Sequence, residues 1–363
     1  MSRLHPNTLL NEKTLWSSIV KKSETLGFQQ IGVTSTQLDE HIARYQKWLD
    51  QGLNADLEYM SAHGSKRWKP GELIEGTLRV ISVRMDYLPE HVDNANAQLS
   101  NPEAAYISRY TLGRDYHKLI RNRLKHLIKF IREESESTLN FRAFVDSAPV
   151  LERAIAQKSG LGWFGKNTMI INRNAGSWFF LGEIYTDLML PLSPEYTEEH
   201  CGSCTACLDV CPTNAFTDPY SLDTAKCISY LTIENKGEIP EDLRQQLGNR
   251  IFGCDDCQLV CPWNKFANLS SEDDFSPRHN LDNATLIELF NWTEEEFLSR
   301  TEGSAIRRTG YTGWLRNIAV ALGNAPSNSD IINALKSKAN HSSPLVKEHV
   351  EWALKQHLQP LSD

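Results

Sequence analysis

The sequence predicts an α+β multidomain protein with a mixed α/β N-terminal domain, a cysteine-rich metal domain and a helical tail. Its 363 residues are enough for two or three domains. Helical and strand patterns are mixed before residue 190, whereas helical patterns alone follow residue 280. All eight cysteines lie between Cys201 and Cys261. We therefore expect domains at 1–190, 191–265 and 280–363.

Composition excludes several classes of protein. Hydrophobic residues make up 40% of the chain, which is enough to build a folded core. The net charge of −8 excludes a general nucleic-acid coat, so any RNA contact needs a local basic face. No apolar run reaches membrane-spanning length, and the first residues lack the apolar stretch of a secretory signal. We expect a cytoplasmic protein that does not bind membranes.

Periodicity predicts the main elements of the N-terminal domain. One helix is expected near residues 15–26, strands at 79–87 and 141–145, and a second helix at 117–132. The second helix has apolar residues on one face and Lys and Arg around the rest. An α/β arrangement of these elements follows.

Two segments of this domain could carry chemistry. Asp146 follows a strand, so its side chain projects into a cleft or simply caps the helix that Pro149 begins. The glycine-rich segment 160–168 could let the backbone approach a large ligand, but its spacing fits neither a dinucleotide nor a phosphate loop. His117 has no visible partner, so we interpret it as an ordinary residue at a helix start.

The cysteines follow a ferredoxin pattern. Residues 201–212 read C-x2-C-x2-C-x3-C-P, the bacterial run whose fourth cysteine binds the other cluster in two-cluster proteins. Residues 254–262 repeat the last three cysteines and the proline, and Cys227 is the only cysteine left to complete that set. We expect two 4Fe–4S clusters, the first held by Cys201, Cys204, Cys207 and Cys261, and the second by Cys211, Cys227, Cys254 and Cys257.

Two other uses of cysteine compete with clusters. Zinc also takes C-x2-C pairs, but it does not need further cysteines at these spacings followed by proline, twice. A disulfide framework belongs to small secreted domains. Tandem clusters relay single electrons, which indicates a redox enzyme or an electron carrier.

The tail contains a weak repeat of 32 residues, in which Ile318, Ala321 and Leu322 recur as Val350, Ala353 and Leu354. The repeat predicts HEAT-like paired helices, although a plain bundle would show the same apolar faces. A local excess of basic residues suggests a phosphate-binding surface, whereas a solvated helix face is the simpler alternative. The basic residues that we single out for tRNA phosphates are Arg307, Arg308, Arg316 and Lys347.

Five segments together resemble the epoxyqueuosine reductase family: VDSAPVLERA at 145–154, GLGWFGKNT at 160–168, GSWFFLGEIYTD at 176–187, CISYLTIE at 227–234 and WLRNIAVALGN at 314–324. They occur in order across three domains. The resemblance implies a cobalamin-binding N-terminal domain similar to that of reductive dehalogenases, a ferredoxin-like domain that feeds it electrons, and a tail that helps to hold tRNA. It also implies the reaction, which reduces epoxyqueuosine at the wobble position of tRNA to queuosine and completes queuosine biosynthesis.

Residue roles follow from the same resemblance. Asp146 is the expected proton donor to the leaving oxygen, kept protonated if the corrinoid and the protein walls desolvate it. We expect a monomer that takes electrons from an unidentified donor. With Asp146, the expected cobalamin contacts are Arg67, Lys166, Asn167, Thr168, Ser177 and Ser229.

Two other functions remain open. A corrinoid reductive dehalogenase, or another small-molecule reductase, typically brings an export signal and leaves the helical tail without a purpose. A plain two-cluster electron-transfer protein leaves the first 190 residues unexplained.

Overall fold

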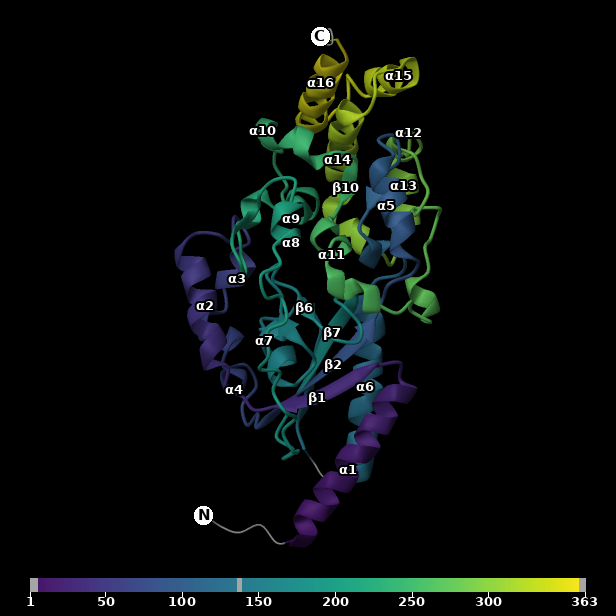
Figure 1. Cartoon of the computed structure of the whole chain (residues 1–363). Coiled ribbons are helices and arrows are strands. Elements are labelled where there is room, and N and C mark those ends of the chain that lie inside the picture. Colours follow the sequence, from purple (N-terminus) through teal and green to yellow (C-terminus); the bar gives the residue numbers. More distant parts are fainter. Residues whose placement is uncertain (1–5, 136–138, 359–363) are drawn as a thin grey trace.

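A computed structural model describes residues 6–135 and 139–358 (Figure 1). The N-terminal part is built on an antiparallel sheet whose strands lie in the spatial order β1, β2, β7, β4. These are β1 (Gln30–Thr34), β2 (Arg79–Asp86), β7 (Phe179–Thr186) and β4 (Phe141–Phe144). β2 pairs with β7 along its whole length and is almost entirely buried, because helices cover both faces of the sheet. The expected strands near 79–87 and 141–145 are confirmed.

Helices α1 (Pro6–Thr25) and α6 (Tyr116–Ser135) cover one face of the sheet, and α7 (Glu152–Lys158) covers the other. The apolar stripe of α6 is buried against β7 and β4, which confirms the amphipathic helix expected there. The other helical elements of this part are α2 (Asp39–Asp50), α3 (Glu58–Ser61), η1 (Gly64–Arg67), α4 (Pro70–Leu73), α5 (Val92–Ser100) and η2 (Arg109–Thr111). Short strands β5 (Trp163–Phe164) and β6 (Ile170–Ile171) pair with each other.

The cysteine-rich segment consists of short elements joined by loops. Its strands are β8 (Phe216–Asp218), β9 (Ser221–Leu222) and β10 (Arg250–Phe252). Its helices are α8 (Ala206–Asp209), η3 (Thr224–Lys226), α9 (Ile228–Ile233), α10 (Glu241–Arg244), η4 (Gln245–Leu247), α11 (Asp256–Leu259), η5 (Pro262–Phe266) and η6 (Asp273–Phe275). The two short helices α8 and α11 lie in contact, and each begins inside one of the cysteine runs.

One hydrophobic core joins parts that are distant in sequence. Strand β3 (Tyr106–Ile107) pairs in parallel with β10, so the N-terminal part contributes directly to the cysteine-rich region. Apolar residues from 105–112, 228–252 and 281–353 pack into this single core. The cysteine loops are therefore held between the sheet and the tail.

The tail is helical, as expected. It contains α12 (Leu286–Phe290), α13 (Glu294–Arg300), η7 (Ala305–Thr309), α14 (Gly310–Asn324), α15 (Ser329–Ser337) and α16 (Pro344–Leu358). Helix α14 is almost fully buried because α16, α12 and β10 surround it. Figure 1 shows α14, α15 and α16 at the end of the molecule opposite α1. None of the described helices combines the length and the apolarity needed to span a membrane.

Candidate functional site

Asp146 lies directly after β4, in a turn that its own backbone makes unusual. Its φ of +47° is in the left-handed region, which aspartate tolerates better than most residues. The side chain does not cap α7, whose N-cap is Leu151, so the capping interpretation is wrong. Instead Asp146 Oδ2 accepts a hydrogen bond from the Tyr116 hydroxyl at 2.7 Å and lies 2.9 Å from His117 Nε2. The Asp146 side chain is 54% exposed, so solvent reaches this carboxylate.

His117 joins two carboxylates. Its Nδ1 lies 2.7 Å from Asp115 Oδ1, and its Nε2 faces Asp146. Burial alone would lower the pKa of His117, but the hydrogen bonds to Asp115 and Asp146 outweigh burial and raise that pKa to about 9. His117 is therefore an imidazolium at neutral pH, and the expectation that it has no partner is wrong.

The charge of His117 also determines the state of Asp146. Burial would raise the pKa of Asp146, but hydrogen bonds from His117 and Tyr116 hold it below the ordinary value. In the free protein the proton of this pair therefore lies on His117; the resemblance implies a protonated Asp146 only where a corrinoid and the protein walls desolvate it. Tyr59 and Arg308, from two other segments, lie near enough to Asp146 for its charge to raise the pKa of both groups.

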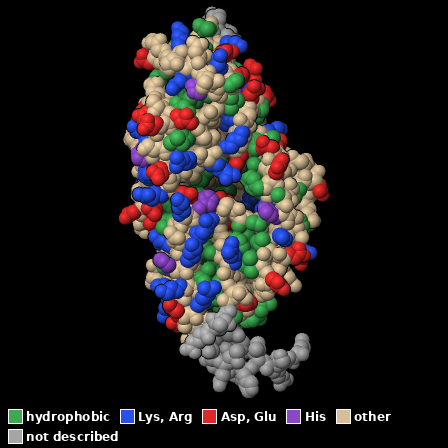
Figure 2. Space-filling model, turned by 180° about the vertical axis from the view of Figure 1, so that it is seen from behind, with side chains coloured by type: hydrophobic (Ala, Val, Ile, Leu, Met, Phe, Trp, Pro, Cys, Tyr) green, Lys and Arg blue, Asp and Glu red, His purple; other side chains and the backbone are tan. Residues whose placement is uncertain are grey.

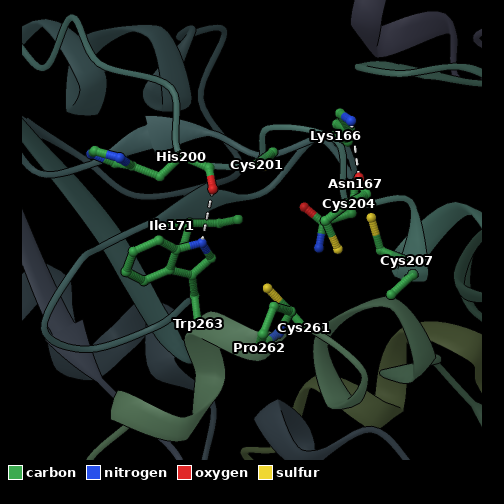
Figure 3. Close-up of a pocket in the computed structure, with 11 residues that line it drawn as sticks. Lys166, Asn167, Ile171, His200, Cys201, Cys204, Cys207, Cys261, Pro262 and Trp263 are labelled. Carbon is green, nitrogen blue, oxygen red and sulfur yellow. Dashed lines mark hydrogen bonds between the residues drawn. The ribbon is translucent and has the colours of Figure 1, made fainter.

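The first cysteine set surrounds one cavity. Cys201, Cys204, Cys207 and Cys261 line it together with Trp263 and other residues from both cysteine runs. Figure 3 shows the sulfurs of Cys204, Cys207 and Cys261 directed into this shared space. Segments about 50 residues apart thus meet as the ferredoxin crossing pattern requires.

The second set comes together from three segments. Cys211, Cys227, Cys254 and Cys257 are near enough in pairs for each thiol to affect the pKa of the next. Asp255, between two of them, is buried and accepts hydrogen bonds from the Tyr106 hydroxyl and the Arg109 backbone N–H, both at 2.8 Å. These bonds fix the second cysteine loop to β3 of the N-terminal part.

Three of the residues expected to contact cobalamin lie beside the cysteine loops. Lys166 Nζ donates to the carbonyl oxygens of Gly202 and Cys204, and Asn167 Nδ2 donates to the carbonyl oxygen of Cys257. The Ser229 hydroxyl lies near enough to the Cys227 thiol to lower the pKa of that thiol, against the larger opposite effect of burial. These contacts place the three side chains at the two cluster sites.

Ser177 does not fit its expected role. Its side chain is buried, and its hydroxyl is bonded to Asn264 and Gln258, which leaves no open face for a cofactor. Ser177 therefore anchors the second cysteine run to β7. The expectation that Ser177 contacts cobalamin is therefore wrong.

Arg67 and Thr168 differ from that group. Arg67 is buried under α3, where its guanidinium bonds to the Tyr59 carbonyl oxygen while its Nε has no partner among the described residues. Thr168 has a φ of +67°, and its carbonyl oxygen accepts a hydrogen bond from Arg153. The bond from Arg153 connects Thr168 to α7.

The expected phosphate contacts separate into two groups. The expectation that Arg316 contacts phosphate is wrong, because its side chain is fully buried. It donates to the carbonyl oxygens of Leu231, Asn235 and Gly237. Arg307 and Arg308 are exposed, and Arg308 forms a two-point ion pair with Glu234. Lys347 is half-buried.

Basic side chains also gather outside the tail. Figure 2 shows them over the N-terminal half of the face seen from behind. Helix α6 exposes five basic side chains, the first of them one residue after His117: Lys118, Arg121, Lys125, Lys129 and Arg132.

This chain combines two cysteine sets of the ferredoxin type with a separate carboxylate–imidazole pair. The combination is typical of a redox protein. Family models match the two parts separately: residues 200–264 match the 4Fe-4S double cluster binding domain, and residues 67–147 match Epoxyqueuosine reductase QueG, DUF1730. The chain is 60% identical over 343 residues to the epoxyqueuosine reductase of Pseudomonas aeruginosa, covering 94% of each protein. It is 56% identical to that of Escherichia coli, covering 92% of this chain and 87% of the relative. The chain belongs to the epoxyqueuosine reductase family.

The fold agrees with that assignment. A crystal structure of epoxyqueuosine reductase with a tRNA-Tyr epoxyqueuosine-modified tRNA stem loop superposes with a TM-score of 0.86 at 26% identity, covering 95% of this chain and 91% of the other. A structure of the Bacillus subtilis enzyme gives a TM-score of 0.81 at 26% identity, covering 96% and 92%. The similarity extends over the sheet, the cysteine loops and the tail.

Proposed function

We propose that this chain reduces the epoxide of epoxyqueuosine in tRNA to the alkene of queuosine, with Asp146 as the proton donor. The net reaction uses two electrons and two protons, breaks both C–O bonds of the epoxide and releases the oxygen as water. Family membership supports the reaction. The observation that carries the residue assignment is the hydrogen bond between solvent-facing Asp146 and the His117 imidazolium.

The pair explains how a carboxylate of low pKa can deliver a proton. In the free protein, water and Tyr116 stabilise the ionic form, in which His117 is charged. A bound substrate excludes water from the exposed side of Asp146, and a less polar environment favours the neutral form of an ion pair. The proton then lies on Asp146 Oδ2, next to the substrate, and His117 becomes neutral.

Two 4Fe–4S clusters fit the cysteine sets. Thiolates are the usual ligands of such clusters, and four thiols facing one cavity match the first site. The first cluster would be held by Cys201, Cys204, Cys207 and Cys261, and the second by Cys211, Cys227, Cys254 and Cys257. Lys166 and Asn167 stabilise these loops, and the Ser229 hydroxyl lies near a ligand sulfur.

Cobalamin is the remaining cofactor, and the exposed side of Asp146 is where it fits. Tyr59 is 45% exposed, and the buried Nε of Arg67, which bonds to the Tyr59 carbonyl oxygen through its guanidinium, has no partner in the described part of the chain. Arg67, Asp146 and Thr168 are therefore the residues that we propose for holding cobalamin. When they are bound, the clusters and cobalamin supply the two electrons of the reaction.

The tRNA substrate would approach Asp146 from solvent. We assign phosphate contacts to Arg307, Arg308 and Lys347, because a basic side chain on the surface can neutralise a backbone phosphate. Arg308 would have to exchange its ion pair with Glu234 for a phosphate. The basic surface of α6, beginning beside His117, offers further phosphate contacts.

The proposed division of labour follows the three domains at 1–190, 191–265 and 280–363. In the tail, α14 and α16 pack on each other with α15 between them in sequence, which supports a HEAT-like pair. The chain acts as a monomer and takes electrons from a separate donor. Cys204 is exposed, so the first cluster lies near the surface that such a donor can reach.

A reconstituted protein tests this function directly. The purified chain, supplied with iron, sulfide, cobalamin and a chemical reductant, is incubated with an anticodon stem loop that contains epoxyqueuosine. We expect the modified nucleoside to lose one oxygen atom, as measured by mass spectrometry after digestion. Omission of cobalamin should abolish the loss. An unchanged nucleoside in the complete reaction would disprove the proposed function.

A further inference from the structure

A second acidic site lies behind Asp146. Glu183 lies on β7, between β2 and β4, and its side chain is fully buried. No donor among residues 6–135 and 139–358 reaches either of its carboxylate oxygens. Its carboxyl is within hydrogen-bonding reach of the Glu152 carboxyl, at the start of α7. A hydrogen bond between two carboxyl groups requires that one of them carries a proton.

Glu152 connects this buried group to the Asp146 turn. Its Oε1 accepts a hydrogen bond from the backbone N–H of Asp146. That N–H belongs to a residue in the left-handed region, a conformation that persists only when its surroundings hold it. Phe144, two residues before Asp146, pairs with Glu183 across the sheet, so the turn and the carboxyl pair occupy the same layer.

Among the described residues no cation bonds to the Glu183 carboxyl, and the nearby charge of Arg153 only partly offsets the effect of burial on Glu152. The titratable groups that face Glu183 are Glu152, Asp146 and Tyr185, and those that face Glu152 also include Arg153 and Tyr116. The Arg153 guanidinium is bound to the Thr168 carbonyl oxygen instead. Two neighbouring buried carboxylates without a bonded counter-ion cannot both ionise at low cost.

We infer that Glu152 and Glu183 are positioning residues that share a proton, and that this proton keeps Glu152 in place to hold the Asp146 turn. The inference rests on the proposed function, in which Asp146 donates the proton. Burial and then the charge of Asp146 raise the pKa of Glu152, and burial and then the charge of Glu152 raise the pKa of Glu183, which agrees with retention of the proton at neutral pH. Loss of the shared proton at high pH would make the two groups repel and release the turn.

The first test needs no turnover. Glu183→Gln replaces the shared proton with a permanent amide donor of similar shape. A folded group that retains a proton that the unfolded chain has released loses stability as pH rises. We expect the melting temperature of Glu183→Gln minus that of the wild type to increase by at least about 3 °C between about pH 6 and about pH 9. The exposed Glu133→Gln is the control and should show no such gain. A constant difference between Glu183→Gln and the wild type would overturn the shared proton.

The second test measures kcat against pH for the same variants. As pH rises, the wild type should lose activity first because Glu152 and Glu183 lose their shared proton, and then because His117 loses its proton. Glu183→Gln should retain wild-type kcat at about pH 7, and its alkaline loss should begin at higher pH, so that at about pH 9 it is at least about threefold faster than the wild type. Alkaline limbs that coincide would show that Glu183 has only a packing role. Absence of turnover in the wild type would instead contradict the proposed function, and the melting experiment would still decide on the pair.

Discussion

His117 Nε2 lies 2.9 Å from Asp146 Oδ2, and this contact joins the start of α6 to the end of β4 across 29 residues of sequence. The same imidazole is held on its other side by Asp115. An imidazolium between two carboxylates keeps its proton well above neutral pH, and the solvent-facing carboxylate is placed to receive that proton when water is excluded. In the proposed reaction the pair would act as a single proton store.

The first prediction concerns the pH dependence of this store. The raised pKa of His117, to about 9, means that the charged form predominates below that pH and disappears above it. We expect kcat to fall as pH rises through about 9. His117→Gln should lower kcat at neutral pH about 10- to 100-fold and remove the part of the alkaline loss that comes from the imidazolium, leaving the loss through Glu152 and Glu183. A His117→Gln enzyme with the wild-type pH profile would show that the imidazole only packs against Tyr116.

The second prediction concerns the ligands of the second cluster. Cys227 lies outside both regular runs, yet it is near Cys211 and Cys257. Cys227→Ala and Cys257→Ala should each lose about four of about eight irons per chain, as measured by iron and sulfide analysis. Ser229→Ala, which keeps the thiol, is the control and should retain all of the iron. A full iron content in Cys227→Ala would overturn the assignment.

The third prediction concerns tRNA binding. The double charge reversal of Arg307 and Arg308 to Glu should weaken binding of the stem loop and flatten its salt dependence, by about one in slope for each lost phosphate contact. The matched control reverses Lys13 and Lys21 on α1, both of which are exposed and distant from the tail. An identical salt slope for both double variants would remove these arginines from the interface. Fluorescence anisotropy of a labelled stem loop at several salt concentrations measures the affinity and its salt slope.

The fourth prediction concerns stability. Arg316 is buried and bonded to three backbone carbonyl oxygens, and its burial lowers its pKa to about 10, which still leaves it charged at neutral pH. Arg316→Ala removes the donor and leaves those acceptors without a partner, so we expect a loss of about 3–5 kcal/mol in the free energy of unfolding. The exposed Arg307→Ala should change it by less than about 0.5 kcal/mol. Denaturant unfolding under anaerobic conditions compares the two.

Features determined by local spacing could be predicted from the sequence. The amphipathic pattern of α6 places its apolar residues every three or four positions, and the structure buries that face. The cysteine spacings are likewise local within each run. Counting the remaining cysteines then led to Cys227, and the structure brings this residue to its expected partners.

Features that depend on distant partners could not be predicted. The charge of Arg316 suggests a surface position, but its carbonyl partners lie 79–85 residues away in α9 and the loop after it. Ser177 resembles a ligand contact only until Asn264 closes over it. The Asp115–His117 spacing was a usable local signal, because the aspartate reaches the imidazole two residues later. The other half of that contact, Asp146, requires the tertiary fold.

The role of Asp146 is tested most directly by Asp146→Asn. The amide has nearly the same shape but cannot pass on a proton from His117. In a single-turnover reaction with a reduced, fully loaded enzyme and the epoxyqueuosine stem loop, we expect the rate of oxygen loss to fall about 10²- to 10⁴-fold. Iron content, cobalamin content and stem-loop affinity should stay at wild-type values. The exposed Asp218→Asn should react at the wild-type rate. An Asp146→Asn enzyme that removes the oxygen as fast as the wild type, with both cofactors in place, would contradict the account.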